Sequence, residues 1–260
     1  MNILTIGDVC GSIGCNYLLK ILPELKRKEN IDCIIVNGEN SADGNGITPS
    51  SSESLFAAGA DIITGGNHTL RRKEVYDTLD NNDFILRPHN LTDCSIGKGY
   101  AELDLGFIRI AVINLSGRVW MPDCNDPFKT ADMLVEKAKE NGIKTILVDF
   151  HGECTAEKRA LAEYLDGRVS AVFGTHTHVQ TADEKILKNG TAFITDLGMT
   201  GPKDSVLGVK TELSIAKIKD GAPVKFSLAD GKSILNGCIF NIDKTNGKTI
   251  AVKRINIEEQ

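Results

Sequence analysis

The sequence VSAVFGTHTHVQ, residues 169–180, joins a short apolar run to two histidines one residue apart. The run Val169–Phe173 has the length and composition of a buried β-strand. Gly174 follows it, and the spacing of His176 and His178 places both side chains on the same face of an extended segment. Only five histidines occur in 260 residues. Taken alone, the pair fits surface residues, a polar pair at a strand end or metal ligands, so its context must decide.

Strands and helices alternate on either side of this stretch. Strands are predicted at residues 3–6, 33–36, 61–64, 109–115, 145–150 and 169–173. Helices are predicted at residues 16–28, 51–58, 73–79, 130–141 and 155–165. Pro23 should kink or divide the first helix, and the serines near residue 51, Thr130 and Thr155 are suited to N-caps. This alternation indicates an α/β architecture.

The last forty residues follow a different pattern. Residues 224–228, 233–241 and 249–257 are separated by Asp230-Gly231 and Asn246-Gly247, dipeptides that are typical of hairpin turns. We therefore expect an antiparallel meander on the same core. Because no interdomain linker is recognisable, residues 1–260 are predicted to form a single domain.

Composition excludes several classes of protein. Hydrophobic residues make up 41% and charged residues 25%, as in soluble globular proteins. The net charge is −5 and no basic stripe occurs, so stable nucleic-acid binding is not expected. No apolar run is long enough for a membrane helix, and no secretory signal precedes the first strand. Seven cysteines without CxxC spacing indicate a reducing cytoplasm.

Polar residues collect where the predicted strands end, which is where sites form in α/β sheets. Each could separately be a cap, a turn residue or a surface residue, but together they predict a metal site. They are Asp8, Glu39, Asn40, Asn67, His68, His151, His176 and His178. A set without thiolates excludes a cysteine-type zinc site and suits Fe, Mn or Zn. So many donors are better used by two ions than by one.

The ordered motifs Gly-Asp, Gly-Glu-Asn, Gly-Asn-His, His and Gly-x-His-x-His resemble those of the calcineurin-like metallophosphoesterase superfamily. IGDVCGSIG, VNGENSADGNGIT, GGNHT, DFHGECTAEK, GTHTHVQTAD and ITDLGMTGP are similar to the bacterial YmdB-type branch. This similarity covers essentially the whole chain. It implies an α/β layered sandwich of helices on two central mixed β-sheets, a homo-oligomer, and two metal ions, Fe first and Mn or Zn as alternatives.

The resemblance also implies a role for each site residue. Ligands of a first metal are matched by Asp8, Asn40 and His178, and ligands of a second metal by Asn67, His151 and His176. Glu39 matches the ligand that bridges the two metals. His68 matches the catalytic histidine. Cys10 stands where the wider superfamily has a histidine, and Glu39 where it has an aspartate; the YmdB-type branch shares both features. Thr69 replaces a more common acidic residue, which leaves open what orients His68. Asp149 or Glu153 could orient His151.

The activity implied by the resemblance is hydrolysis of a small phosphodiester, a 2′,3′-cyclic nucleotide. A metal-bridging hydroxide would attack phosphorus, and His68 would protonate the leaving oxygen as general acid. Two alternatives remain open from the sequence. One is a phosphomonoesterase or 5′-nucleotidase on the same centre, and the other is a regulatory protein that binds metal or nucleotide without turnover.

Overall fold

The first of two β-sheets has seven strands. In the computed structural model, which describes residues 1–92 and 94–260, they are β1 (Asn2–Ile6), β2 (Asp8–Val9), β3 (Cys33–Asn37), β4 (Ile62–Thr64), β11 (Met199–Pro202), β12 (Ser233–Ile242) and β13 (Thr249–Glu258). Their order is β2-β11-β12-β1-β3-β4, with β13 paired to β12. Strands β1, β3 and β4 are parallel to one another, whereas β12 is antiparallel to β1. The sheet is therefore mixed.

The second sheet has six strands. They are β5 (Tyr100–Asp104), β6 (Arg109–Ser116), β7 (Thr145–His151), β8 (Ala171–Thr175), β9 (Lys185–Ile186) and β10 (Ala192–Ile194), in the order β5-β6-β7-β8-β10-β9. Four of them, β6, β7, β8 and β10, are parallel neighbours. The carboxyl ends of parallel strands lie at one edge of each sheet, which is the arrangement that the predicted site requires.

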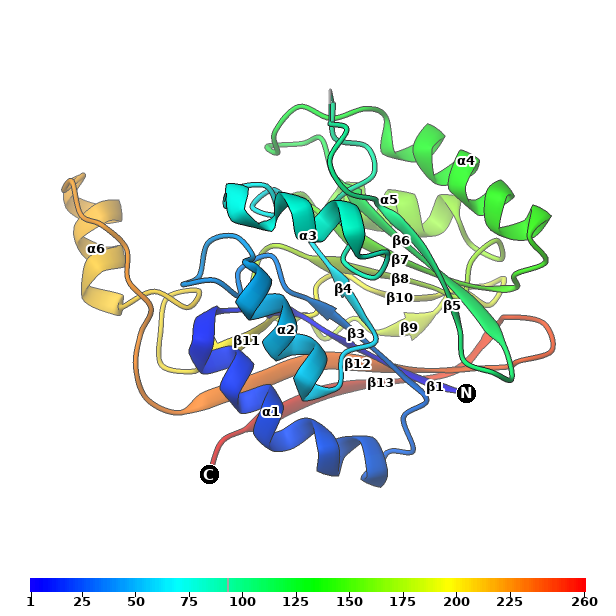
Figure 1. Ribbon diagram of the computed structural model, residues 1–260, viewed down its shortest axis with the longest axis horizontal. Helices are drawn as coiled ribbons and strands as arrows, with labels where there is room; N and C mark the ends of the chain where they lie inside the picture. Colours follow the sequence, from blue (N-terminus) through cyan, green and yellow to red (C-terminus); the bar gives the residue numbers. More distant parts are fainter. Residues whose placement is uncertain (93) are drawn as a thin grey trace.

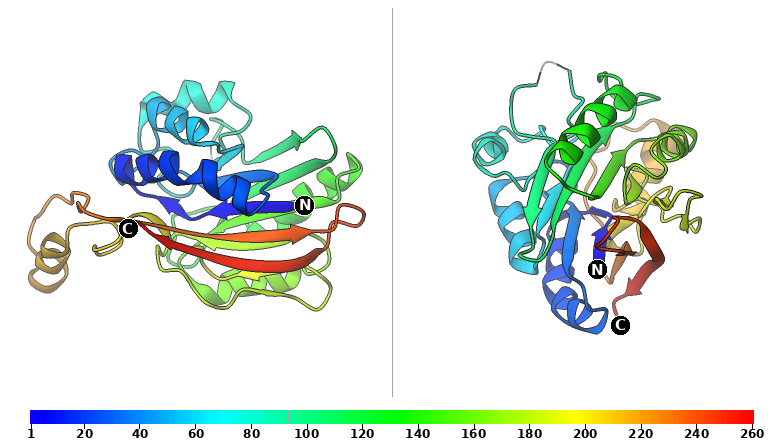
Figure 2. Two further views of the ribbon diagram at one scale, coloured as in Figure 1. Left: turned by 90° about the horizontal axis from the view of Figure 1, so that it is seen from below. Right: turned by 90° about the vertical axis from the view of Figure 1, so that its right-hand side faces the viewer.

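The two sheets face each other, and helices cover their outer sides (Figures 1 and 2). The first sheet packs against α1 (Gly11–Lys28), α2 (Pro49–Ala58), the 3-10 turn Lys73–Val75 and α3 (Tyr76–Asn81). The second packs against α4 (Pro127–Glu140) and α5 (Thr155–Tyr164). Between the sheets, Phe173 and Phe240 stack with ring centroids 6.1 Å apart. The predicted fold class, helices on two mixed sheets, is confirmed.

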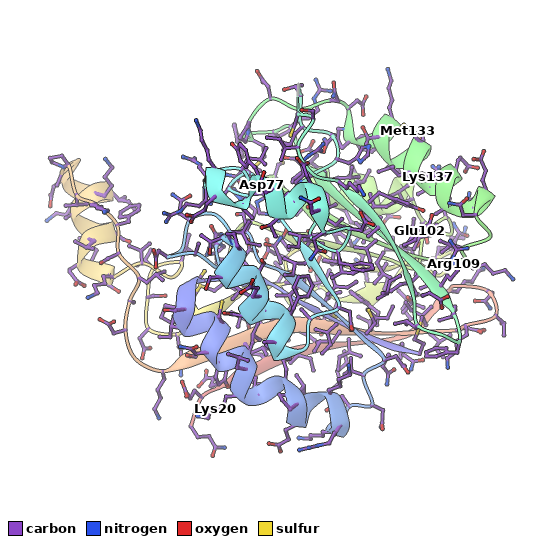
Figure 3. The ribbon with its side chains drawn as sticks, in the orientation of Figure 1. Lys20, Asp77, Glu102, Arg109, Met133 and Lys137 are labelled. Atoms are coloured by element: carbon purple, nitrogen blue, oxygen red, sulfur yellow. The ribbon has the colours of Figure 1, made fainter. Side chains whose placement is uncertain are left out.

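Helix α4 shows how the spacing of apolar residues decides which face is buried. Met133 and Lys137, four residues apart, are exposed and lie on the outside of the molecule (Figure 3). The opposite face, which packs on the second sheet, consists of Ala131, Leu134, Val135 and Ala138. This apolar stripe at helical spacing is what attaches the helix to the sheet.

Several predicted helix ends differ from the structure. Helix α1 is continuous through Pro23, because that residue lies on the exposed face, where water can bond the carbonyl that proline leaves unpaired. The N-cap of α2 is Thr48, whose side chain and Ser51 form a reciprocal capping box. The N-cap of α4 is Asp126, which accepts hydrogen bonds from two backbone N–H groups. In both helices a proline occupies the first turn.

The predicted C-terminal meander is only partly correct. Strands β12 and β13 form the expected hairpin around Asn246-Gly247. Residues 224–228 are not a strand, and only Leu228 forms an isolated bridge, with Val209. These residues belong instead to an arm, residues 203–232, which carries the unpredicted helix α6 (Thr211–Asp220) and extends away from the body (Figures 1 and 2). Among the described residues, no helix is long and apolar enough to cross a membrane.

Candidate metal centre

The eight predicted site residues come from the strand ends of both sheets. Asp8 lies in β2, Glu39 and Asn40 follow β3, and Asn67 and His68 follow β4. His151 ends β7, and His176 and His178 follow β8. The structure brings all eight side chains together at the edge where the two sheets meet, as their hydrogen bonds and ion pairs show.

One group of potential ligands surrounds His151. Glu39, His151 and His176 each offer one ligand atom, and these three atoms lie within 4.8 Å of one another. His151 Nε2 is 2.9 Å from Asn67 Oδ1, 3.1 Å from His176 Nδ1 and 3.3 Å from Glu39 Oε1. The arrangement joins imidazole, amide and carboxylate from both sheets around one small volume.

A second group surrounds His178. Its Nε2 lies 3.7 Å from Asp8 Oδ1 and 3.2 Å from Asn40 Nδ2. Asn40 Nδ2 also donates to Glu39 Oε1 at 3.1 Å, so Glu39 touches both groups. Asp8 is fully buried, and its Oδ1 has no hydrogen-bond partner among the described residues. A buried carboxylate oxygen without a partner is costly unless a cation approaches it.

Outer hydrogen bonds determine which ring nitrogens carry protons. Thr175 donates its hydroxyl hydrogen to Asp149 Oδ1 at 2.7 Å, so it accepts from His151 Nδ1 at 2.9 Å. His178 Nδ1 donates to the carbonyl of Leu207 at 3.0 Å. His176 Nε2 lies 3.1 Å from a carboxylate oxygen of Glu153. Since these oxygen partners accept the ring N–H, the second nitrogen of each ring points inward, where it presents a lone pair whenever the ring is neutral.

With neutral rings, the inward side of the site consists largely of acceptors facing acceptors, apart from the amide NH2 group of Asn40. Burial opposes charge on His151, yet Glu39 and Asp8 raise its pKa, so the position favours a positive charge. Burial also opposes ionisation of Glu39, but His151 and His68 hold the pKa of its carboxyl at about 2. Burial and the neighbouring His151 lower the pKa of His176 to about 3. These donor types and this charge pattern fit divalent cations.

The comparisons with known proteins agree with this geometry. The family model described as "YmdB-like protein" matches residues 4–255. This chain belongs to the YmdB-like protein family. It is 46% identical, over its whole length and 98% of the relative, to the 2′,3′-cyclic-nucleotide 2′-phosphodiesterase of Bacillus subtilis.

Solved structures support the same family. A hypothetical protein from Thermus thermophilus is 38% identical with a TM-score of 0.94, and each chain is covered completely. A structure described as a novel phosphatase from Mycoplasma pneumoniae is 36% identical with a TM-score of 0.93, covering 99% of this chain and 93% of the other. The NAD nucleotidase of Haemophilus influenzae, at 14% identity and a TM-score of 0.60, shares the fold over 98% of this chain and 55% of its own.

Two glycines allow this YmdB-like site to be so compact. A Cβ at Gly66 would lie 2.3 Å from both Glu39 Oε2 and His151 Nε2, so a side chain there cannot coexist with the observed positions of Glu39 and His151. A Cβ at Gly174 would lie 1.8 Å from the carbonyl oxygen of Thr195. Beyond Gly174 the chain turns sharply, since His176 and His178 have φ values of 102° and 65°, in the left-handed region.

The structure answers the question of what orients His68. Its Nδ1 lies 2.8 Å from Asn40 Oδ1, and its backbone N–H donates to Glu39 Oε2. Thr69 does not take part, because its hydroxyl bonds to the backbone of Gly66. The oxygen of Asn40 thus faces His68 while its amide nitrogen faces Glu39 and His178, so binding of a metal by that oxygen requires the amide to turn.

The residues that contact the outer side of the candidate metal-binding histidines were the hardest to assign from the sequence. Asp149 orients His151 only indirectly, through Thr175, and Glu153 contacts His176. Cys10 Sγ lies 3.8 Å from Nδ1 of His178, the nitrogen that points away from the acceptor cluster. Leu207 contributes a backbone carbonyl, for which no sequence signal exists.

Thr175→Val should weaken metal binding by roughly 10–100-fold, because it removes the acceptor that fixes the ring of His151. Titration of metal-free protein with Mn²⁺ by calorimetry measures this change. Thr145→Val is the matched control: Thr145 is buried in the same strand β7, and its hydroxyl has no partner within the described part of the chain. Equal affinities of the two variants would contradict the role of Thr175.

Proposed function

We propose that this chain is a phosphodiesterase that uses two metal ions to hydrolyse 2′,3′-cyclic nucleotides. The observation that carries the proposal is the convergence of one inward ring nitrogen from each of three imidazoles with the carboxylates of Glu39 and Asp8. Whole-length identity of 46% to a 2′,3′-cyclic-nucleotide 2′-phosphodiesterase supports the substrate class. A pure binding protein would not need a positioned histidine such as His68 beside the ligands.

Each ion would be held by a separate part of the donor set. Asp8, Asn40 and His178 would hold the first, Asn67, His151 and His176 the second, and Glu39 would contact both. Iron is our first choice, with manganese or zinc as alternatives, since similar donors accept all three. When bound, two such ions polarise the phosphate and supply a nucleophile at neutral pH by lowering the pKa of water.

His68 would act on the leaving oxygen. Its side chain is 27% exposed, and its Nδ1 lies against the side-chain amide of Asn40 at 2.8 Å, which leaves Nε2 for the substrate side. Burial lowers the pKa of His68, although the neighbouring Glu39 opposes that shift. In its protonated form the ring donates from Nε2 to the alkoxide that forms as the P–O bond of the cyclic diester breaks.

Hydrolysis of 2′,3′-cyclic AMP compared with 5′-AMP tests the function directly. Protein reconstituted with Fe²⁺ or Mn²⁺ should hydrolyse the cyclic diester, and Asp8→Ala should abolish the activity, because it removes the buried first-metal carboxylate. Hydrolysis of 5′-AMP alone would move the function to a nucleotidase. Two bound metals with neither substrate hydrolysed would rule out this substrate class and favour a binding protein.

His68→Ala should lower kcat by about 10²–10⁴-fold, the usual contribution of a general acid, and leave two metals per chain. Steady-state kinetics and elemental analysis measure the two effects separately. His89→Ala is the control, because His89 packs against Gly99, outside the site, and its Nδ1 has no partner among the described residues. Loss of both metals from His68→Ala would identify His68 as a ligand and not as the acid.

We also propose that the arm, residues 203–232, joins copies of this chain into a homo-oligomer. Helix α6 has ten residues and buries only Ser214, although helices of this length are marginal in water without a packing partner. The arm exposes large apolar side chains: Leu207, Ile215, Ile218 and Phe226. Ile215 and Ile218 lie three residues apart on one helix face.

Ile218→Glu should dissociate the oligomer, since it places a charge where an apolar contact is needed. Light scattering coupled to size-exclusion chromatography gives the mass of each species. Ile250→Glu, at an exposed position in β13 outside the arm, is the control and should keep the wild-type mass. A wild-type protein that is monomeric at micromolar concentration would end the proposal.

A further inference from the structure

A buried ion pair lies directly behind the metal-site histidines. Lys158, on α5, is completely buried, and its Nζ is 2.7 Å from Oδ2 of Asp196, which is 1% exposed. Of the Lys and Arg ion pairs within the described residues, it alone has both partners buried. Neither residue belongs to the predicted ligand set.

Stability does not account for such a pair. Removing two charges from water costs several kcal/mol per ion, and apolar residues of similar size often replace buried pairs without loss of stability. Where a protein retains a buried ion pair, the way the pair fixes the surrounding structure says more about its role than its contribution to stability does. Here that surrounding structure includes the backbone of the loop that carries His176 and His178.

The carboxylate of Asp196 connects two segments of the site. Its Oδ2 accepts from the backbone N–H of Thr177 at 3.1 Å, and its Oδ1 accepts from that of Gly198 at 2.8 Å. Thr177 stands between His176 and His178, both of which have positive φ, a conformation that non-glycine residues adopt at a cost. Gly198 leads into β11, where Met199 pairs in register with Asp8. One carboxylate therefore holds the histidine loop and the strand beside Asp8.

The stem of Lys158 fills the space behind two other site segments. A Cβ at Gly174 would lie 2.8 Å from Lys158 Cδ, and one at Gly152 would lie 3.9 Å from Lys158 Cε. Gly174 precedes the histidine loop and Gly152 follows His151. The lysine thus passes along the outer side of the segments that carry His151 and His176, and delivers its charge to Asp196.

We propose that Lys158 is a positioning residue for the metal centre. Its ammonium pairs with the carboxylate of Asp196, and that carboxylate accepts both backbone N–H groups, which holds His176 and His178 in their left-handed conformations with their inward nitrogens able to offer lone pairs to the site. The inference rests on the proposed metal-dependent function, because positioning matters only if those lone pairs bind ions. It assigns a role to the lysine of DFHGECTAEK and the aspartate of ITDLGMTGP.

Mn²⁺ binding to metal-free Lys158→Met tests the proposal. Met keeps the length of the stem and removes the charge, so Mn²⁺ affinity should fall by roughly 10–100-fold, as for other residues that orient metal ligands. Urea denaturation of the metal-free protein is measured in parallel. Lys139→Met, at an exposed lysine paired with Glu136 on α4, controls for loss of a lysine charge and should bind Mn²⁺ as the wild type does.

A double variant keeps the experiment decisive if Lys158→Met does not fold. Lys158→Met/Asp196→Asn buries no unpaired charge, but the single amide oxygen replaces the two carboxylate oxygens that hold Thr177 and Gly198. It should fold and still bind Mn²⁺ at least about tenfold more weakly. Wild-type affinity in a folded variant, even with a lower urea midpoint, would overturn the positioning role and leave the proposed function intact. Failure of the wild type to bind Mn²⁺, Fe²⁺ or Zn²⁺ would overturn both.

Discussion

The buried carboxylate of Asp149 is the interaction on which the site and the packing of the two sheets both depend. It accepts hydrogen bonds from Thr64 and Asn37 of the first sheet and from Thr175 of the second. Burial raises its pKa to about 6 although these bonds favour the ionised form. Because its partners end neighbouring strands in facing sheets, this one group fixes how the strand ends meet and, through Thr175, how the ring of His151 is turned.

Bringing the two sheet edges together gathers polar groups that repel one another when no cation is present. Glu39 and Asp8 come from one sheet and the three imidazoles from the other, and with neutral rings all of them present acceptors inward. Packing energy from the apolar core between the sheets offsets the repulsion. Glu39 and Asp8 raise the pKa of His151, and the same two carboxylates, which converge with the imidazoles, would also attract a bound cation.

The parts of the fold that were predictable are those specified by local sequence. The central strands are continuous apolar runs, and the helices between them have apolar stripes at helical spacing. Strands β2 and β11 were not predictable, because they are two and four residues long and exist through pairing of Asp8 with Met199, far apart in the chain. Residues 224–228 alternate as a strand does, but no neighbouring strand offers them a continuous edge.

The convergence of the eight candidate site residues could be predicted because each follows a recognisable strand, whereas the groups that orient them could not be predicted. Thr175 resembles any threonine in a strand, and Lys158 resembles any lysine in an amphipathic helix until its burial is known. The contact from Leu207 is made by its backbone carbonyl, which every residue type has, yet it fixes the orientation of the His178 ring. Leu207 belongs to the arm, and Leu228 at the other end of the arm lies against Gly11 and Gly44, whose absent side chains leave it room. One end of the arm is thus bonded to His178, and the other packs against segments that follow Asp8 and Asn40 in the chain, so a contact that displaces Leu207 would also act on His178.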